Sequence, residues 1–335
     1  MPAAGLTTWG VLGTARIAVE AMIPAIQASD RNDVVAVASR DGRRARAVAD
    51  TFGVQRSYGS YDELLADPAV DAVYVPLPNS LHVEWVERAA RAGKHVLCEK
   101  PLGLGAPDVQ RLIRVRDETG VRIQEAFMVR THPQWTLAKR LVEDGDLGTL
   151  RAVQGFFSFH STDPQDIVNQ PDLGGGGLLD IGCYPVVLAR MVIGSEPTHA
   201  FLATDADPVT GVDRLGSAVL TFGSVHASFS YSTQLADHER MELFFTAGRV
   251  QLDQPFTPDG TAPCRLLVHR DGPSSVEAME VRACNQYTLA VDAFTDALCA
   301  GGPQPVPLED SLATARATDA LRRSASTGRL EPVHQ

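Results

Sequence analysis

The feature that most constrains the fold is a regular alternation of apolar segments and helical patterns in the first 126 residues. Short apolar segments bounded by turn formers are expected as strands at Trp9–Gly13, Val34–Ala38, Val70–Pro76, His95–Cys98 and Val121–Ala126. Helices are expected between them over residues 42–52, 61–66, 83–92 and 106–119. Such alternation implies a doubly wound α/β domain with a mostly parallel sheet and right-handed crossovers. Ligands of such sheets bind at the carboxyl ends of the strands.

Size and charge narrow the class of protein. A chain of 335 residues exceeds the size at which one core usually stops growing, so we expect two domains, over residues 1–126 and 127–335. The net charge of -11 argues against nucleic acid and membrane as partners, since both need a basic face. No apolar run approaches the roughly 20 residues that cross a bilayer, and Met1–Thr7 has no signal-peptide character. We therefore expect a cytoplasmic protein.

The five cysteines have neither the close spacing nor the neighbouring histidines of a metal site. We expect them to be reduced structural thiols, and we expect no bound metal.

The turn after the first expected strand has the pattern of a phosphate-binding turn. Gly13 permits the tight turn, Ala15 stands where the backbone approaches a pyrophosphate, and Ala18 lets the helix pack on the strand. The amides at the helix start would then hold the phosphates. Pro24 would break the helix, so we expect it in two pieces. The residues expected around the cofactor in this turn are Gly13, Thr14, Ala15, Arg16 and Ile17.

The end of the second expected strand favours NADP over NAD. An NAD-binding protein usually carries an acid here for the ribose 2′-hydroxyl, whereas this chain has Ser39 and Arg40, followed by Arg43 and Arg44. Hydroxyl and guanidinium groups suit a 2′-phosphate, and we expect Ser39, Arg40 and Arg44 to bind it. Asp41 keeps NAD possible, and a solvated helix start is the alternative interpretation of the arginines.

A charged pair and a proline end the fourth expected strand. Because Pro101 cannot donate to a sheet ladder, Lys100 comes at the carboxyl end of a buried strand, where ligands bind. The exit of the third strand lies at the same edge. A turn asparagine and a helix-start histidine are the alternative interpretations of Asn79 and His82. The further residues expected near the cofactor are Pro76, Leu77, Asn79, His82, Glu99 and Lys100.

Three motifs together resemble the glucose-fructose oxidoreductase/inositol dehydrogenase (Gfo/Idh/MocA) family. They are Gly-x-x-Gly-x-Ala-x-x-Ala from Gly10, Val-Tyr-Val-Pro-Leu-Pro-Asn-x-x-His up to His82, and Glu-Lys-Pro-Leu from Glu99. The resemblance covers nearly the whole chain. It implies an N-terminal Rossmann domain and a C-terminal α/β domain with a large open, mostly antiparallel sheet that often forms a homodimer or higher oligomer. It also implies that Lys100 is catalytic and that Asn79 and His82 lie near the nicotinamide.

The second half predicts the elements of such a domain. Strands are expected at 150–160 and, as consecutive antiparallel neighbours, at 215–222, 225–233, 240–246 and 248–253, with an edge strand at 264–269. Helices are expected at 135–143, 285–300 and 308–327, and the last of these could pack back on the first domain.

Two stretches of the second half contain candidate substrate residues. The stretch Glu-Ala-Phe-Met-Val-Arg-Thr-His-Pro after residue 124 is similar to the sugar and dihydrodiol dehydrogenases of the family. Its Arg130 and His132 could face substrate or join the domains. In the polar loop 161–172, Asp163 and Asn169 could bind a polyhydroxylated ligand or simply belong to a surface loop. The four glycines that follow permit close approach of the backbone.

The segment after these glycines carries the candidate proton donor. Asp180 and Tyr184 are four residues apart and share one face of a helix, with a kink expected at Pro185. Family members commonly have histidine where this chain has Tyr184, and those similar to glucose-fructose oxidoreductase and dihydrodiol dehydrogenase carry tyrosine. The tyrosine disfavours the chemistry of an inositol dehydrogenase with a histidine base.

These residue types suit hydride transfer between a carbinol carbon and a nicotinamide. A tyrosine has an ordinary pKa near 10, and a nearby lysine ammonium lowers it. We therefore expect Tyr184 to be the acid or base, Lys100 its electrostatic partner, and Asp180 to orient the substrate; Lys100 as the proton carrier stays open. The sequence predicts an NADP-dependent oxidoreductase acting on a sugar-like ring. The alternatives are a nucleotide-sugar ketoreductase of deoxysugar biosynthesis and an NADP-sensing regulator without turnover.

Overall fold

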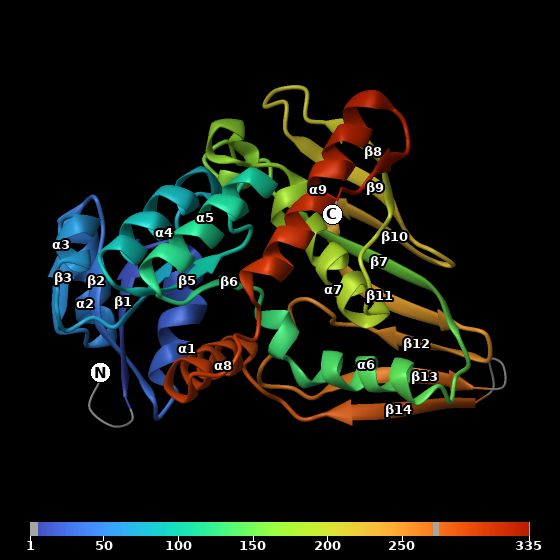
Figure 1. Cartoon of the computed structure of the whole chain (residues 1–335), viewed down its shortest axis with the longest axis horizontal. Coiled ribbons are helices and arrows are strands. Elements are labelled where there is room, and N and C mark those ends of the chain that lie inside the picture. Colours follow the sequence, from blue (N-terminus) through green and yellow to red (C-terminus); the bar gives the residue numbers. More distant parts are fainter. Residues whose placement is uncertain (1–5, 271–274, 335) are drawn as a thin grey trace. The chain divides into compact units, whose positions relative to one another are not determined.

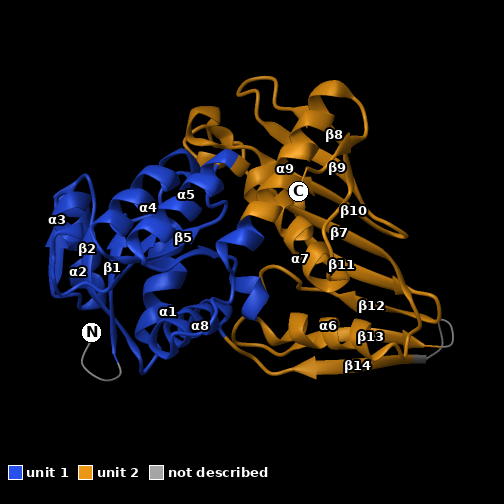
Figure 2. Ribbon diagram, in the orientation of Figure 1, with its two compact units in different colours: residues 1–103, 107–131, 285–311 blue, residues 104–106, 132–284, 312–335 orange. Residues whose placement is uncertain are grey.

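The computed structural model describes residues 6–270 and 275–334, and the chain divides into two compact units (Figure 2). The first unit contains residues 1–103, 107–131 and 285–311. The second contains residues 104–106, 132–284 and 312–335. Both units are therefore discontinuous in sequence. Part of the amino-terminal stretch from which we argued against a signal peptide, residues 1–5, lies outside the described residues.

The first unit is built on a six-stranded parallel sheet with the order β3-β2-β1-β4-β5-β6 (Figure 1). Its strands are β1 (Thr7–Leu12), β2 (Asn32–Ala38), β3 (Arg56–Tyr58), β4 (Ala72–Val75), β5 (His95–Glu99) and β6 (Ile123–Ala126). The prediction of a doubly wound parallel sheet is confirmed. The sequence pattern missed β3, because its three residues are half-buried and show no apolar run.

Helices connect these strands, as the alternation predicts. They are α1 (Ile23–Gln27), α2 (Gly42–Phe52), α3 (Tyr61–Leu65), α4 (His82–Arg91), α5 (Ala106–Thr119) and, from the C-terminal part of the chain, α8 (Gln286–Ala300). A π-helical turn, Ala18–Met22, precedes α1, and Pro24 lies in the first turn of α1. The expected break at Pro24 does not occur: the backbone stays helical through Pro24, and the irregularity is the π-helical turn that precedes it.

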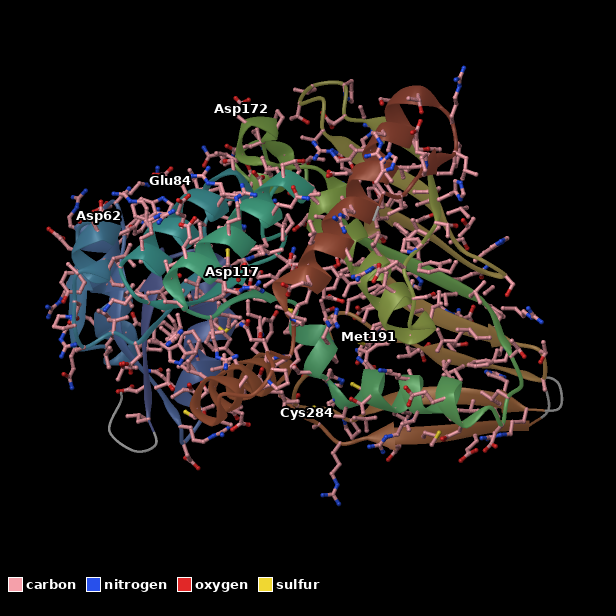
Figure 3. All side chains as sticks on the ribbon, in the orientation of Figure 1. Asp62, Glu84, Asp117, Asp172, Met191 and Cys284 are labelled. Atoms are coloured by element: carbon pink, nitrogen blue, oxygen red, sulfur yellow. The ribbon has the colours of Figure 1, made fainter. Side chains whose placement is uncertain are left out.

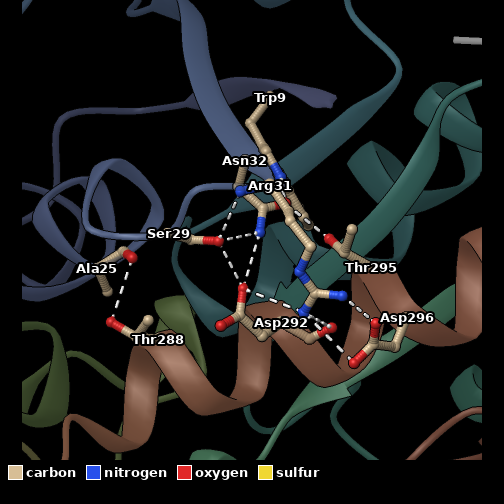
Figure 4. A network of polar contacts seen from close by, with 9 residues as sticks. All are labelled: Trp9, Ala25, Ser29, Arg31, Asn32, Thr288, Asp292, Thr295 and Asp296. Carbon is tan, nitrogen blue, oxygen red and sulfur yellow. Dashed lines mark hydrogen bonds and ion pairs between the residues drawn. The ribbon is translucent and has the colours of Figure 1, made fainter. Parts of the chain in front are cut away.

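Helix α8 belongs to the first unit because it packs onto the core of the parallel sheet. Val291 and Phe294 are fully buried there, and the Phe294 ring lies 5.5 Å from the Trp9 ring. A polar network reinforces this contact (Figure 4). The buried Asn32 side chain accepts hydrogen bonds from Trp9 Nε1 at 2.8 Å and from Thr295 Oγ1 at 2.6 Å. The sequence reveals the helix but not the unit to which it returns.

The second unit is built on a nine-stranded sheet with the order β14-β13-β12-β11-β7-β10-β9-β8-β15 (Figure 1). Its strands are β7 (Leu150–His160), β8 (His199–Ala206), β9 (Asp213–Phe222), β10 (Val225–Ser232), β11 (Gln234–Phe245), β12 (Gly248–Leu252), β13 (Cys264–Arg270), β14 (Ser275–Val281) and β15 (Glu331–Pro332). All pairs are antiparallel except β7 with β10. The large, mostly antiparallel sheet is confirmed.

Two details of this sheet correct the sequence prediction. β10 and β11 are not neighbours, because they lie on opposite sides of β7. Thr233, the residue between them, passes the end of β7, where its carbonyl accepts from the Ser161 amide at 2.8 Å. The sequence placed the start of the second strand at 240, which left room for a hairpin, whereas only Thr233 separates the two strands, too few residues for a hairpin turn. The segment 264–269 is not an edge strand either, because β14 lies outside β13.

The helices of the second unit are α6 (Pro133–Asp144), α7 (Cys183–Ile193) and most of α9 (Leu308–Thr327). By length and composition, the helical stretch Pro171–Ile193 could cross a membrane, with a mean hydropathy of 1.5. However, 83% of its apolar window is buried inside the structure, as in the core helix of a domain. The expectation that no such run exists is therefore wrong, although the burial explains the run.

Candidate active site

The turn after β1 is held in the shape that the glycine pattern predicts. Gly13 has a φ of +130°, and a Cβ added there would lie 3.2 Å from the Leu77 side chain. The Gly13 amide donates to the Ala38 carbonyl at 2.9 Å, and the amide of Ala18 donates to the Ala15 carbonyl at 3.0 Å. Thr14 and Ala15 are half-buried and Arg16 is exposed. Residues 14–16 are therefore at least partly exposed at the carboxyl end of β1, where a phosphate would bind.

The end of β2 gathers positive charge. Arg40 and Arg44 both lie close enough to the Tyr61 hydroxyl to oppose the rise in its pKa, a rise that burial causes. Among the described residues, no carboxylate lies within 4 Å of the guanidinium of either arginine. Asp41 instead caps α2 by accepting from the Arg43 amide at 2.9 Å. These two arginines are consequently available to an anion.

Ser39, the third residue predicted for the 2′-phosphate, is 7% exposed. Its hydroxyl accepts from the Asp41 amide at 3.3 Å, so it helps to shape the start of α2.

The exit of β4 brings Pro76, Leu77 and Asn79 to the same edge of the sheet. Asn79 begins a short 3-10 turn, Asn79–Leu81, and is half-buried. His82 is fully buried at the start of α4. Its Nε2 lies 2.7 Å from the Leu77 carbonyl oxygen, and its Nδ1 lies 2.7 Å from the Pro101 carbonyl oxygen. Burial lowers the pKa of His82.

Lys100 is half-buried at the carboxyl end of β5, and Glu99 before it is 7% exposed. The hydroxyl of Tyr74, on the neighbouring strand β4, donates to Glu99 Oε1 at 2.6 Å. Tyr287 of α8 lies against the same pair. Burial raises the pKa of Tyr287 to about 12; the Glu99 carboxylate adds to this rise and Lys100 opposes it. Lys100 therefore lies beside the buried Tyr74 and Glu99 and the half-buried Tyr287.

Sequence reasoning missed Glu125, which is also buried at this edge. Its Oε1 accepts from the Leu102 amide at 2.8 Å, two residues beyond Lys100. It lies on β6 and is 4% exposed, beside the 2% exposed Gln124. Two polar residues inside a short buried strand were the available signal, because an apolar side chain is the usual occupant of such positions.

In the second unit, Asp180 and Tyr184 follow one another along a helical stretch, as predicted. Asp180 lies in a π-helical turn, Leu178–Gly182, and Tyr184 in the first turn of α7. Pro185 does not break the helix, because α7 runs through it, and the irregular part of this stretch is the π-turn before α7. Tyr184 is 7% exposed, and its ring packs edge-on against Phe157 and Phe256, 5.6 and 5.7 Å away. The rings of Phe157 and Phe256 thus fix the position of the Tyr184 ring by packing against it.

The glycine run before this helix packs tightly. A Cβ on Gly175 would lie 2.6 Å from the carbonyl oxygens of Ile167 and Val168. A Cβ on Gly177 would lie 2.8 Å from the Tyr231 ring, whose hydroxyl donates to Asp213 at 2.6 Å. The glycines therefore allow the close backbone approach that the sequence indicated.

The loop residues predicted for substrate differ in exposure. Asn169 is 3% exposed, and its amide donates to the Asp163 carbonyl at 2.9 Å, whereas the Asp163 side chain is exposed and accepts from the Gln165 amide at 2.8 Å. Asn169 thus organises the loop that presents Asp163.

Arg130 and His132 have partners within their own units. Arg130 forms an ion pair with Asp310 in the first unit. In the second unit, His132 Nδ1 accepts from the Gln134 amide at the start of α6, and its Nε2 lies 3.3 Å from the Sγ atom of Cys284. Figure 3 labels Cys284. Burial lowers the pKa of His132. His132 therefore serves as a helix cap.

The described residues include no group of three or more His, Cys, Asp or Glu side chains arranged to hold a metal ion. The five cysteines are free thiols, and those at 98, 183 and 264 are buried.

Comparison with known proteins finds a family match in each of the two units. The family model described as the oxidoreductase family with an NAD-binding Rossmann fold matches residues 7–127, and the one described as the GFO/IDH/MocA C-terminal domain matches residues 135–251. An uncharacterized oxidoreductase of Rhizobium meliloti is 48% identical to this chain, over 98% of the chain and 99% of its own length.

Two further relatives carry descriptions of their activity. A D-xylose 1-dehydrogenase (NADP(+)) of Haloferax volcanii is 40% identical, over 96% of this chain and 98% of its own length. The crystal structure of a 3-ketoreductase from Actinomadura kijaniata, in complex with NADP and TDP-benzene, has 35% identity and a TM-score of 0.90, covering 96% of this chain and 98% of that one. The two family matches and these relatives together show that the chain belongs to the Gfo/Idh/MocA oxidoreductase family.

Proposed function

We propose that this protein is an NADP-dependent oxidoreductase that interconverts a hydroxyl and a carbonyl group on a sugar or sugar-like ring. The observation that carries the proposal is the carboxyl edge of the parallel sheet. There, Arg40 and Arg44 lack carboxylate partners among the described residues, and Lys100 emerges at the end of β5. The first feature suits a phosphorylated ribose and the second suits a reacting oxygen.

The residues at this edge fit the dinucleotide. Gly13 and the turn through Ile17 would hold the pyrophosphate, and Arg40 and Arg44 would hold the 2′-phosphate. Asp41 is engaged as the cap of α2, which weakens the case for a ribose 2′-hydroxyl and hence for NAD. Pro76, Leu77 and Asn79 line the same edge and would face the nicotinamide half. When bound, the cofactor accepts or supplies a hydride.

Tyr184 and Lys100 carry the proton chemistry in this proposal. In the oxidative direction the substrate hydroxyl gives its proton to the Tyr184 oxygen as its C–H electron pair leaves with the hydride. The Lys100 ammonium stabilises negative charge on the phenol and on the substrate oxygen. Asp180 orients the substrate, and Asp163 contributes further polar contacts. In the reductive direction the same proton returns to the carbonyl oxygen.

A solved relative supports these two roles. The 3-ketoreductase from Actinomadura kijaniata was also crystallised with a tyrosine replaced by phenylalanine and with a lysine replaced by alanine or glutamate. That lysine and that tyrosine are separated by the same number of positions as Lys100 and Tyr184.

The second candidate function is reduction of a keto group on a nucleotide-linked sugar. It is favoured by the same relative, which was crystallised with TDP-benzene as well as NADP. The two candidates share the cofactor and the reacting groups and differ in whether the substrate carries a nucleotide. A non-catalytic NADP sensor is less favoured, because it has no use for Lys100 and Tyr184.

A substrate screen tests the proposal. Purified protein is assayed for NADPH absorbance with D-xylose and other aldoses plus NADP⁺ or NAD⁺, and with dTDP-linked keto sugars plus NADPH. We expect turnover with NADP(H), and we expect Lys100→Met and Tyr184→Phe to lower kcat about 10²-fold or more. Lys139→Met and Tyr58→Phe are matched controls, and they should keep wild-type kcat. Wild-type kcat in both site variants would refute the assigned roles.

We further propose that the protein is a cytoplasmic homodimer. The net charge of -11 supports the location, because it disfavours association with an anionic membrane surface. The solvent-exposed side of the nine-stranded sheet, which includes Ser217 and Val219, supports self-association through that side.

A further inference from the structure

The turn that carries Lys100 is held by side chains from two other elements of the first unit. Glu125 Oε1 of β6 accepts from the Leu102 amide at 2.8 Å. His82 Nδ1 of α4 lies 2.7 Å from the Pro101 carbonyl oxygen. Both side chains are almost completely buried. The two residues that follow Lys100 are therefore fixed through their backbone groups.

The Glu125 carboxyl has charged and titratable neighbours on three elements. β5 contributes Cys98, which pairs with Glu125 in register, and the turn after β6 contributes Arg130. Helix α9 contributes Asp310, the ion-pair partner of Arg130. Burial is the main reason that the pKa of Glu125 rises to about 7; Asp310 acts in the same direction, whereas the Ser311 hydroxyl, the Leu102 amide and Arg130 oppose it. Glu125 is thus poised to change charge near neutral pH.

We propose that Glu125 is a positioning residue for the reaction: its carboxylate fixes the turn that carries Lys100 through the Leu102 amide, beside the Arg130–Asp310 ion pair. This inference rests on the proposed role of Lys100. It gives Arg130 a function within the first unit in place of substrate contact. A bond from an amide to a carboxylate is about twice as strong as one to a neutral acceptor, so ionisation of Glu125 tightens the turn.

A purely structural role would not require a carboxyl group here. A glutamine has the same shape, its side-chain oxygen still accepts from Leu102, and it avoids the cost of a buried charge. The substitution Glu125→Gln therefore separates the two roles, because it keeps the hydrogen bond and removes only the charge.

The first experiment compares the pH dependence of kcat in the wild type and in Glu125→Gln, with the substrate found in the screen. We expect wild-type kcat to rise with pH through about 7 as Glu125 ionises. Glu125→Gln should lack this rising limb of the pH profile, and its kcat at pH 8 should be about five- to tenfold lower than that of the wild type. Its Kd for NADP should change less than twofold. Asp67→Asn is the matched control: it neutralises another buried carboxyl of the first unit and should leave the limb in place.

The charged neighbours allow the limb to be moved in both directions. Arg130 lowers the pKa of Glu125, so Arg130→Met should move the limb to higher pH. Asp310 raises that pKa, so Asp310→Asn should move the limb to lower pH. A limb that stays in place in both variants would overturn the proposal.

A second measurement needs no substrate. The chain has only three lysines, at 94, 100 and 139, so [¹³C]methylation of lysines gives three assignable side-chain NMR signals. We expect the Lys100 signal of the wild type to show an inflection near pH 7 that Glu125→Gln abolishes, while the signal of the exposed Lys139 shows none. If the inflection is present but the protein turns over no substrate, the proposed function fails and the positioning role stands. If the Lys100 signal of Glu125→Gln keeps the inflection of the wild type, the positioning role is overturned.

Discussion

The arginines after β2 differ in what each one binds, and this difference determines their expected effect on cofactor choice. Arg43 is almost fully exposed and lies 3.5 Å from the Asp41 carboxylate. Arg40 and Arg44 converge on the Tyr61 hydroxyl, with no carboxylate within 4 Å of either one among the described residues. A phosphate is a stronger acceptor than a phenol, so these two side chains have most to gain from a 2′-phosphate.

We therefore predict that Arg40→Ala and Arg44→Ala each raise the Kd for NADPH by about 10- to 100-fold, since hydrogen bonds to charged groups contribute about 1.5–3 kcal/mol. The Kd for NADH should change less than threefold. Fluorescence titration of the nicotinamide measures both constants. Arg43→Ala serves as the control and should alter neither value. Equal losses for both cofactors would show that these arginines do not read the 2′ position.

The buried Glu125 carboxyl predicts a specific dependence of stability on pH. Its pKa is raised from 4.5 to about 7, so between these values the folded protein binds more protons at this group than the unfolded chain does. Protonation of Glu125 therefore stabilises the folded protein, and this stabilisation is fully present below about pH 4.5 and is lost as pH rises towards 7. We predict that, as pH rises through this window, the free energy of unfolding of the wild type falls relative to that of Glu125→Gln. The slope is at most about 1.4 kcal/mol per pH unit.

Urea unfolding at pH 5, 6, 7 and 8 measures this difference. Glu118→Gln, which neutralises an exposed glutamate, is the control and should run parallel to the wild type. A constant difference between the wild type and Glu125→Gln across the series would contradict the assigned titration.

The catalytic candidates could be named from the sequence because each follows a recognisable local pattern. Lys100 comes where a proline ends an apolar strand, and Gly13 comes where a strand turns into a helix. Glu125 and Tyr74 could not be found in this way. Their role depends on which residues of neighbouring parallel strands lie side by side, and that register is set by the packed sheet.

At the scale of elements, α8 shows how a distant segment completes the parallel sheet. It is held to β1 and β2 by the Asn32 network, which includes Trp9, Thr295 and Asp292 (Figure 4). Asn32 is 4% exposed, and its amide also donates to Ser29 Oγ at 2.9 Å. The oxygen and the nitrogen of the buried Asn32 side chain thus both make hydrogen bonds, and loss of this side chain leaves buried groups without partners.

We predict that Asn32→Ala lowers the free energy of unfolding by about 2–4 kcal/mol, because it leaves the buried Trp9 N–H without an acceptor. Denaturant unfolding followed by circular dichroism measures the change. Arg31→Ala removes the neighbouring, partly exposed ion pairs with Asp296 and Asp292 but leaves Asn32 in place, and it is the control; we expect about 1 kcal/mol or less there. Similar losses in both variants would mean that the network is no more than a surface contact.

The glycine run before α7 is an element whose backbone is packed too closely for side chains. A Cβ at Gly175 would meet the carbonyl oxygens of Ile167 and Val168 at 2.6 Å, which neither backbone segment can avoid without moving. We predict that Gly175→Ala destabilises the protein by roughly 2 kcal/mol or more and lowers kcat, since the Tyr184 helix starts from this run. Thermal unfolding and the turnover assay check both effects.

The control for this prediction is Gly302→Ala, because an added Cβ there meets nothing within 4 Å and its φ is not positive. It should leave the unfolding temperature and kcat unchanged. If Gly175→Ala is as stable as this control, the backbone around Gly175 can move at little cost to accommodate a Cβ, and the prediction is wrong.

Elements with a strong periodic pattern were predicted to within a few residues. The helix at Gly42–Phe52, the helix at Ala106–Thr119 and the strand at Leu150–His160 agree at both ends. The order of strands in the large sheet was harder to predict, because β10 and β11 are adjacent in sequence but lie on opposite sides of β7. Strand patterning reports which face is buried and not which neighbour a strand pairs with.

At the scale of the whole molecule, the proposed dimer depends on one face of the nine-stranded sheet. The half-exposed and exposed side chains on this face come from β7, β8, β9, β10 and β11, and they include Phe156, Phe201, Ser217, Val219, Ser228 and Ser230. They combine apolar and small polar groups, with Arg240 and Glu242 at one side joined by a 2.6 Å ion pair. An exposed face of this composition suits self-association, which commonly buries about 800 Å² on each partner.

We predict that the wild type elutes with twice the chain mass of 36.0 kDa in size-exclusion chromatography with light scattering. Val219→Glu places a charge in the middle of the proposed interface, and on a twofold axis each copy would meet its own mutation, so the dimer should dissociate at least tenfold more readily. Val209→Glu is the matched control, since Val209 is 89% exposed in the turn between β8 and β9 and should leave the dimer intact. A monomeric wild type, or equal effects of the two glutamates, would exclude self-association through this face.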